Sequence, residues 1–281
     1  MYYQLGLIGY PIEHSMSPWL HRQFLQKSDL PGEYSLIELA SEQLLAEKLQ
    51  QIKHVPFDGF NVTVPYKQEI IPYLDQLDAH ARAVGAVNTV VQENGQWVGY
   101  NTDGLGYTAS LKQHYPAIFQ KQTSRVLLIG AGGAARGIFD GLVTAGLTRI
   151  DIANRTHSRA EPIAELGDDN VHSVILTLQE AEQQLHYYDL IIQTTNVGMK
   201  PNDKTLILSL DNLREDTIVS DIVYQPIETA FLRQAKQKGA AILHGHTMLF
   251  YQALYAFELW TSEKVKTETM EQTLKTVLEG R

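Results

Sequence analysis

The stretch Arg125–Gly137, which reads Arg-Val-Leu-Leu-Ile-Gly-Ala-Gly-Gly-Ala-Ala-Arg-Gly, decides which fold is expected. Its apolar opening predicts a buried strand, and the glycines that follow predict a tight turn into a helix. Gly130, Gly132 and Ala135 have the spacing G-x-G-x-x-G/A, in which the first glycine permits the turn and the second lets a pyrophosphate approach the backbone. Glycine-rich turns also simply join strands to helices. Inside a βαβ unit, however, the motif favours a dinucleotide bound at the helix N-terminus.

The sequence around this turn supplies the βαβ context. From about Ser124 onward, β-rich runs alternate with helical patterns, which is typical of a parallel α/β sheet. The strand candidates are Arg125–Ile129, Arg149–Ala153, Val171–Leu176, Asp189–Gln193, Ile218–Asp221 and Ala241–Leu243. A complete doubly wound (Rossmann) dinucleotide-binding domain has this number of strands. We therefore predict an α/β protein with a Rossmann domain in its second half.

The first hundred residues also alternate between strand and helix patterns. Strands are expected at Leu5–Gly9, Tyr34–Leu39 and Gly59–Val64, and helices at Pro18–Lys27, Ser41–Ile52 and Lys67–Leu74. Val87–Gln92 and Gln96–Tyr100 flank Asn94-Gly95, a strong hairpin signal. The segment Gly104–Gln122 is expected to link the two halves. An amphipathic helix is expected at the end of the chain, on the apolar spacing of Met270, Leu274, Val277 and Leu278.

The residues after the second strand of the Rossmann half favour NADP(H) as the cofactor. This strand ends in Asn154-Arg155-Thr156, with Arg159 after the turn, and carries no Asp or Glu to bind an unmodified ribose 2′-hydroxyl. A carboxylate there would repel a 2′-phosphate, whereas guanidinium groups pair with it. The arginines are also compatible with a solvated helix start, but their place beside the expected ribose favours the phosphate.

The composition argues against several classes of function. The 281 residues include no cysteine, which excludes a disulfide framework, a thiolate nucleophile and a Cys-ligated metal. The ten histidines show no metal-ligand spacing, so no metal is expected. A net charge of −9 argues against nucleic-acid and anionic-membrane partners. No signal-peptide pattern is present, and the apolar run Met248–Trp260 is too short to span a membrane, so a cytoplasmic protein is expected.

Two hydroxyls at a predicted helix start form a candidate carboxylate site. They belong to the motif His14-Ser15-Met16-Ser17-Pro18. Ser17 is explained equally well as the N-cap of a helix whose first residue is Pro18. Even in that case, the helix N-terminus with the Ser15 hydroxyl remains a natural site for a carboxylate.

A lysine, two amides and a carboxylate are expected at one sheet edge. Asn61 and Thr63 share one face of a predicted strand, and Lys67 follows at its end. With a two-residue turn in the hairpin, Asn88 pairs opposite residue 101, which brings Asn88 and Asp103 to the same end. A proton donor, a carboxylate to orient it and amides to bind hydroxyls together suit the reduction of a ketone.

Motifs along nearly the whole chain occur in the order of one known family. They are His14–Pro18, Asn61–Lys67, Gly85–Thr89, Asn101–Gly104, Gly130–Gly137, Asn154–Thr156, Asp221–Glu228, Gly245, Met248-Leu249 and Tyr251–Ala253. In these motifs the chain resembles the shikimate dehydrogenase family. The resemblance implies an oxidoreductase that reduces 3-dehydroshikimate to shikimate with NADPH, in aromatic amino-acid biosynthesis. One departure is Gln193, where the family usually has asparagine in the run through Thr195, Gly198 and Met199.

The resemblance also implies roles for individual residues. Lys67 and Asp103 would be the catalytic pair, and Ser15 and Ser17 would hold the substrate carboxylate. The other substrate-binding residues would be Asn61, Thr63, Asn88, Tyr224 and Gln252. The cofactor-binding residues would be Gly130, Ala131, Gly132, Gly133, Ala134, Asn154, Arg155, Thr156, Arg159, Thr195 and Gly245.

The domain boundaries and the alternative functions follow from the same resemblance. Residues 1–103 would form the substrate-binding domain, completed by C-terminal helices in residues 245–281, and residues 104–244 the NADP-binding domain. One alternative is a quinate/shikimate dehydrogenase that uses NAD, which the two arginines disfavour. Another is a non-catalytic shikimate-sensing homologue, which should have lost the lysine or aspartate or gained a DNA-binding module. A monomer or a homodimer is expected.

Overall fold

The computed structural model describes residues 2–53, 57–121 and 123–280. Gln122, the last residue of the predicted linker, lies outside the described residues, as do the two terminal residues of the chain. The chain divides into two compact units, residues 1–102 with 252–268 and residues 103–251 with 269–281. Within the described ranges, none of the helices has the length and the apolar run needed to cross a bilayer.

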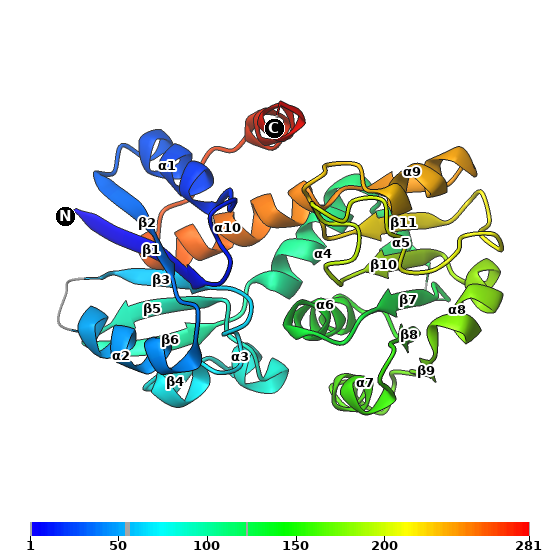
Figure 1. Ribbon diagram of the computed structural model, residues 1–281, viewed down its shortest axis with the longest axis horizontal. Helices are drawn as coiled ribbons and strands as arrows, with labels where there is room; N and C mark the ends of the chain where they lie inside the picture. Colours follow the sequence, from blue (N-terminus) through cyan, green and yellow to red (C-terminus); the bar gives the residue numbers. More distant parts are fainter. Residues whose placement is uncertain (1, 54–56, 122, 281) are drawn as a thin grey trace. The chain divides into compact units, whose positions relative to one another are not determined.

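The second unit is built on a parallel sheet (Figure 1). Its strands are β7 (Val126–Ile129), β8 (Ile150–Ala153), β9 (Ile175–Leu176), β10 (Leu190–Gln193), β11 (Ile218–Asp221) and β12 (Ala241–Leu243). In the described residues they form a six-stranded sheet in the order β12-β11-β10-β7-β8-β9, with parallel pairing. The winding reverses between β7 and β10, as in doubly wound dinucleotide-binding domains. The predicted fold class is confirmed, and Val171–Leu176 is the one predicted strand that is much shorter in the structure.

Apolar side chains cover both faces of this sheet. Along β7, Val126 and Leu128 belong to one buried cluster, whereas Leu127 and Ile129 belong to another. Because successive side chains of a strand point to opposite faces, the two clusters lie on opposite sides of the sheet. A strand buried on both faces has a continuous apolar run, as the sequence of β7 does. The covering helices include α6 (Gly133–Thr144), α7 (His157–Ala164), α8 (Leu178–Gln184) and α9 (Ala230–Gln237).

The predicted linker, residues 104–122, is mostly helical. It contains α4 (Asp103–His114) and α5 (Ala117–Gln120), and both belong to the second unit. Tyr107, Leu111 and Ile118 are buried in the same apolar cluster as the first face of the sheet. Helix α4 has little amphipathic pattern of its own. Packing on a neighbouring apolar surface, rather than periodicity, stabilises this helix.

The first unit contains a mixed sheet. Its strands are β1 (Tyr3–Gly9), β2 (Gly32–Glu38), β3 (Gly59–Val62), β4 (Gln76–Leu77), β5 (Thr89–Glu93) and β6 (Gln96–Tyr100). Their order is β2-β1-β3-β5-β6-β4, with β1 parallel to β2 and β3, and β5 antiparallel to β3 and β6. The predicted hairpin is confirmed: Asn94 and Gly95 form its turn with φ of 52° and 82°. Such positive values suit asparagine and glycine.

The helices of the first unit differ from prediction at one place. α1 (Ser17–Lys27) and α2 (Glu42–Lys53) lie close to their predicted ranges, and α3 (Ala79–Val84) begins at the N-cap Asp78, which accepts from the amide of Ala81 at 2.7 Å. The predicted helix over residues 67–74 is wrong, because these residues form turns and a single 3₁₀ turn, Ile71–Tyr73. Pro72 lacks an amide hydrogen and disfavours the helical conformation of the residue before it.

The C-terminal segment contributes to both units. It forms α10 (Gly245–Thr261) and α11 (Met270–Glu279), and α11 is the helix that the apolar spacing predicted. Residues 252–268 group with the first unit, where the Trp260 indole donates to the carbonyl oxygen of Val90 at 2.8 Å. Residues 245–251 and 269–281 group with the second unit, in which Met248 joins the apolar core and His114 bonds Glu271 at 3.0 Å. The compact units therefore divide the C-terminal segment at different residues from the predicted domains.

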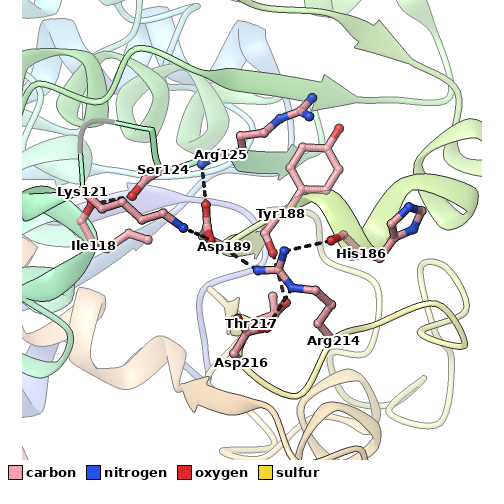
Figure 2. A network of polar contacts seen from close by, with 10 residues as sticks. All are labelled: Ile118, Lys121, Ser124, Arg125, His186, Tyr188, Asp189, Arg214, Asp216 and Thr217. Carbon is pink, nitrogen blue, oxygen red and sulfur yellow. Dashed lines mark hydrogen bonds and ion pairs between the residues drawn. The ribbon is translucent and has the colours of Figure 1, made fainter.

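A network of polar side chains lies at the amino ends of β7 and β10 in the second unit (Figure 2). Asp189 lies at its centre, immediately before β10, and accepts from the Lys121 ammonium at 2.7 Å, the Arg125 amide at 2.9 Å and the Arg214 guanidinium at 3.3 Å. Burial opposes ionisation of this carboxyl, but these donors together hold the pKa of Asp189 below its ordinary value. The carboxylate thus ties two adjacent strand starts to a loop that precedes β11.

We expect Asp189→Asn to lower the free energy of unfolding at pH 7 by roughly 1 to 2 kcal/mol, because it removes a charged acceptor from several donors. A depressed carboxyl pKa stabilises the fold above the pKa of the unfolded chain, about 4, and this contribution is lost as the pH falls through the lower pKa of the folded state. The difference between wild type and variant should therefore shrink below about pH 4 in urea titrations. Asp216→Asn is the control, since its carboxylate bonds the same Arg214 but is 76% exposed. An equal loss in both variants, or one independent of pH, would contradict this account.

Candidate active site

The glycine-rich turn after β7 has the shape that a dinucleotide needs. Gly130 has a φ of 115°, and a Cβ there would lie 2.5 Å from the Thr194 hydroxyl, so the turn requires glycine. A Cβ at Gly132 would meet no protein atom within 4 Å, so the space beside this backbone is open. Gly132 is the N-cap of α6 and supplies no side chain to its first amides. Open space next to helix-terminal amides that have no side-chain cap fits a pyrophosphate.

The turn after β8 carries the polar residues predicted to choose between NADP(H) and NAD(H). Asn154 stabilises it by donating from its side-chain amide to the carbonyl oxygen of Thr156 at 2.7 Å. Arg155 and Arg159 are exposed, and the described residues 154–159 include no acidic side chain. Because β8 neighbours β7 in the sheet, this turn and the glycine-rich turn lie at the same edge. Two guanidinium groups without a carboxylate fit a 2′-phosphate.

The loop after β10 is held by Gln193. The side-chain amide of Gln193 donates to the Val197 carbonyl oxygen at 3.0 Å, and its oxygen accepts from the amide of Thr195. The Thr195 hydroxyl in turn accepts from the Val197 amide at 3.1 Å. Thr195, a predicted cofactor residue, is thereby fixed within its loop. The departure from asparagine at residue 193 is accommodated by these bonds to the loop backbone.

A buried carboxyl, Asp221, joins this loop to the end of β11. Its Oδ1 accepts from the Gln193 amide at 3.1 Å and from the Val223 backbone at 2.9 Å, and its Oδ2 accepts from the Thr229 hydroxyl at 2.7 Å. Burial raises the pKa of Asp221 to about 7, while these three bonds act in the opposite direction. Asp221 had no predicted role beyond its place in the motif Asp221–Glu228. The available signal was an acidic residue at the end of the otherwise apolar strand Ile218–Asp221.

The other predicted residues of the second unit lie at the starts and ends of its elements. Asp103 is the first residue of α4 and is 2% exposed. Tyr224 follows β11 in the loop that Asp221 anchors, and Gly245 is the first residue of α10. Asp103 groups with the second unit and Lys67 with the first.

The two predicted carboxylate-binding hydroxyls lie at the start of α1. Ser15 donates from its hydroxyl to that of Ser17 at 3.2 Å and accepts from the Ser17 amide at the same distance. The alternative in which Ser17 is the N-cap is wrong: Met16 is the N-cap, and Ser17 is the first residue of the helix. The Ser17 hydroxyl therefore has no capping role, and it is close to Ser15 as a carboxylate site requires.

The predicted amide residues of the first unit meet in one buried network. The Asn88 side chain donates to the Thr102 hydroxyl at 2.9 Å and to the Gln252 amide oxygen at 3.1 Å. Its own oxygen accepts from the Thr102 backbone at 2.8 Å. Asn61 donates to the Asn88 carbonyl oxygen at 3.1 Å. Three predicted substrate-binding residues, from β3, the start of the hairpin and α10, are thus connected.

Thr63 and Lys67 lie just beyond β3. The Thr63 backbone bonds the Ile8 carbonyl oxygen at 2.9 Å, which continues the pairing with β1 past the end of the strand. The carbonyl oxygen of Lys67 accepts from the Val87 amide at 2.7 Å. This bond places the lysine backbone beside the residue that precedes Asn88. The Lys67 side chain is half-buried.

Sequence reasoning missed the aromatic residues that support this network. Tyr34 donates from its phenol to the Asn61 amide oxygen at 2.7 Å. His21 stacks on the Tyr34 ring with a centroid distance of 4.4 Å and an interplanar angle of 8°. The only signal for Tyr34 in the sequence is its place in a β-rich run, which does not reveal which neighbour its hydroxyl bonds.

The polar side chains gathered among the described residues suit an organic ligand with several hydroxyl groups. Hydroxyls and amides predominate, and no cluster of three or more His, Asp or Glu side chains that would hold a metal ion occurs in the described part of the chain. Together with the glycine-rich turn and its exposed arginines, this inventory suits hydride transfer to or from a small polar molecule.

Comparison with family models gives three consecutive matches. Residues 7–90 match the shikimate dehydrogenase substrate binding domain, and residues 113–223 match the shikimate/quinate 5-dehydrogenase model. Residues 245–275 match the shikimate 5′-dehydrogenase C-terminal domain. Together these matches span most of the chain.

Individual relatives and structures agree with the family models. The chain is 52% identical over 277 residues to the shikimate dehydrogenase (NADP(+)) of Oceanobacillus iheyensis, covering 99% of each chain. It is similar to the crystal structure of shikimate 5-dehydrogenase from Thermus thermophilus in complex with NADP(H) and shikimate, with a TM-score of 0.85, 31% identity and coverage of 98% and 99%. It is also similar to quinate dehydrogenase from Corynebacterium glutamicum in complex with NAD, with a TM-score of 0.88, 30% identity and coverage of 98% and 99%. The chain belongs to the shikimate dehydrogenase family.

Proposed function

We propose that the chain reduces 3-dehydroshikimate to shikimate with NADPH, as an oxidoreductase acting on a CH–OH group. The main support for NADPH as the cofactor is the pair of turns after β7 and β8. The glycine-rich turn after β7 is open, and the turn after β8 has arginines and no carboxylate. The relative from Oceanobacillus iheyensis, which covers 99% of the chain, is named for shikimate and NADP(+). Both observations favour NADP(H) over NAD(H).

We assign the two functions to the two parts of the chain as the sequence suggested. Residues 1–103, with contributions from residues 245–281, would bind the substrate, and residues 104–244 would bind the cofactor. In support, the connected amides Asn61, Asn88 and Gln252 all belong to the first compact unit, and the glycine-rich turn belongs to the second. Thr63 would complete the hydroxyl-binding set.

The substrate carboxylate would bind at the start of α1. Ser15 and Ser17 offer adjacent hydroxyls there, and the first amides of the helix favour a negative charge. Tyr224 would lie against the substrate from the loop after β11. Ordered groups such as these reduce the entropy lost on binding and hold the ketone in one orientation.

The cofactor would lie along the carboxyl edge of the parallel sheet. Its pyrophosphate would bind at the backbone of Gly130, Ala131, Gly132, Gly133 and Ala134. Asn154, Arg155, Thr156 and Arg159 would surround the ribose phosphate, and Thr195 and Gly245 would approach the nicotinamide. Bound NADPH supplies the hydride that converts the ketone carbon into a secondary alcohol carbon.

The chain's own contribution to the chemistry would be proton supply and orientation. As hydride reaches the carbonyl carbon, the C=O π bond breaks and negative charge develops on the oxygen. The Lys67 ammonium would hydrogen-bond this oxygen and supply the proton, directly or through water. Asp103 would orient the lysine and accept a hydrogen bond from a substrate hydroxyl. Acid–base assistance of this kind accelerates reactions by about 10²–10⁴-fold.

A second candidate is the oxidation of quinate with NAD, because the quinate dehydrogenase from Corynebacterium glutamicum is structurally similar at a TM-score of 0.88. Oxidation of shikimate and of quinate, each with NADP⁺ and with NAD⁺, distinguishes the two. Turnover restricted to shikimate with NADP⁺ is expected. Comparable turnover of quinate with NAD⁺ would replace the proposal with the second candidate, and no turnover of either would refute both.

We expect Arg155→Ala to raise the KM for NADP⁺ by about tenfold, because a hydrogen bond to a charged group contributes about 1.5–3 kcal/mol. The KM for NAD⁺ should change little, since NAD⁺ has no 2′-phosphate. Arg149→Ala is a matched control, because Arg149 is also exposed but precedes β8 instead of following it. Initial rates of shikimate oxidation at varied NADP⁺ and varied NAD⁺ give both KM values for Arg155→Ala and for the Arg149→Ala control. Equal changes with both cofactors would show that Arg155 does not bind the phosphate.

We expect Lys67→Ala to lower kcat for shikimate oxidation by about 10²–10⁴-fold, with little change in the KM for shikimate, because the lysine acts on the reacting oxygen. Lys27→Ala, an exposed lysine at the end of α1, serves as the control for loss of a positive charge. A kcat within a factor of about three of wild type would remove Lys67 from the chemistry.

A further inference from the structure

The Tyr34 phenol has no part in the proposed mechanism, yet it bonds a residue that does. Tyr34 lies in β2, and its hydroxyl donates to the Asn61 amide oxygen at 2.7 Å. Asn61 lies in β3 and is 7% exposed. Strand β1 separates β2 from β3 in the sheet, so this bond passes over the face of β1. The bond therefore connects the Asn61 side chain to the strand beyond β1.

The surroundings of Asn61 admit only one orientation of its amide. Its nitrogen faces the Asn88 carbonyl oxygen at 3.1 Å and the Thr89 hydroxyl oxygen at 3.1 Å. A backbone carbonyl only accepts, so the nitrogen must face it, and the oxygen must face Tyr34. The Thr89 hydroxyl donates to the Asn88 side chain at 3.0 Å, so it accepts from Asn61. Both amide hydrogens of Asn61 are thus used within the protein.

A ligand can therefore reach only the acceptor of this side chain. An amide oxygen has two lone pairs, and Tyr34 occupies one of them. Without the tyrosine donor, the Asn61 oxygen would lose the bond that fixes it on one side of the strand. The amide would then be held only through its nitrogen.

Aromatic packing holds the Tyr34 ring in place. His21 stacks on it at 4.4 Å, and the Trp260 ring lies at 6.3 Å with an interplanar angle of 50°. Burial lowers the pKa of His21 to about 3, against a smaller opposite effect of Asn61, so this ring is neutral at physiological pH. Burial likewise raises the pKa of Tyr34 well above its ordinary value, with a hydrogen bond to Ser17 acting in the opposite direction. The phenol therefore keeps the proton that it donates.

We propose that Tyr34 is a positioning residue that fixes the Asn61 amide so that it offers an acceptor to a hydroxyl donor of the substrate. This inference rests on the proposed function, in which Asn61 binds a ring hydroxyl. If Asn61 offers only its oxygen, the substrate hydroxyl that binds there must donate the hydrogen bond to that oxygen.

The test is Tyr34→Phe, which removes the hydroxyl and keeps the stacked ring. We expect the KM for shikimate to rise roughly fivefold to tenfold, the effect of one hydrogen bond. The KM for NADP⁺ and kcat should stay within about twofold, because neither depends on Asn61. A general loss of folding would instead lower kcat and the unfolding temperature together. An unchanged KM for shikimate would overturn the inference.

A double-variant cycle tests whether Tyr34 acts through Asn61. Asn61→Ala should raise the KM for shikimate, and adding Tyr34→Phe should raise it no further, since the phenol no longer has an amide to position. Multiplying effects would mean that Tyr34 acts on the substrate independently, which would also overturn the inference. Tyr100→Phe is the matched control: its phenol bonds Glu93 at 2.6 Å in the same unit, and no kinetic change is expected.

The wild-type enzyme separates failure of this inference from failure of the proposed function. If the wild type oxidises shikimate and Tyr34→Phe has a normal KM, the inference fails and the function stands. If the wild type oxidises only quinate, the same cycle measured with quinate decides the role of Tyr34. If the wild type oxidises neither compound, the proposed function fails and the inference fails with it.

Discussion

The parallel register of β8, β7, β10 and β11 is the constraint on which the second unit depends. Since these strands run in the same direction, their carboxyl ends meet at one edge and their amino ends at the other. The glycine-rich turn, the arginine-bearing turn and the loops after β10 and β11 all leave from the first edge. Loops at that edge are free to bind a ligand, because the apolar clusters on both faces already stabilise the strands.

Two aspartates mark the opposite ends of this sheet and have opposite electrostatics. Asp189, before β10, is surrounded by a lysine, an arginine and a backbone amide, which lower its pKa. Asp221, at the end of β11, is bonded by neutral donors and is fully buried, so its pKa rises to about 7. The first carboxylate bonds charged groups at the amino edge of the sheet. The second joins the loops after β10 and β11 through its bonds to Gln193, Val223 and Thr229.

In the first unit, several amide side chains are buried and hydrogen-bonded to one another or to their neighbours. Asn88 is 2% exposed, yet its amide bonds Thr102 and Gln252. Each buried amide that is fully paired has a fixed orientation, because a rotation would place like groups against each other. The protein's own hydrogen bonds thus already orient these amides. Such prior orientation lowers the entropic cost of binding a molecule with several hydroxyls.

Features that depend on neighbouring residues were predictable from the sequence. The turn at Asn94-Gly95, the strand-to-helix turn at Gly130–Gly137 and the apolar strands of the second unit depend on local conformational preferences, and the structure contains all of them. The prediction for residues 67–74 failed even locally, because a helical pattern was given more weight than Pro72. The resemblance to a family added Tyr224, Gln252 and Gly245 to the predicted site residues, which no local pattern indicates.

The remaining features depend on contacts between residues far apart in the chain. Asn88 and Gln252 are 164 residues apart, and the bond between them exists only because the part of α10 from Gln252 onward belongs to the first unit. Tyr34 meets Asn61 across an intervening strand, and the pKa of Asp221 depends on how deeply packing buries it. The sequence by itself determined the local turns, the strands and the doubly wound class, because backbone sterics and side-chain alternation act within a few residues. Only the tertiary structure decided which polar groups are paired, since burial and hydrogen bonding depend on what the rest of the chain brings alongside.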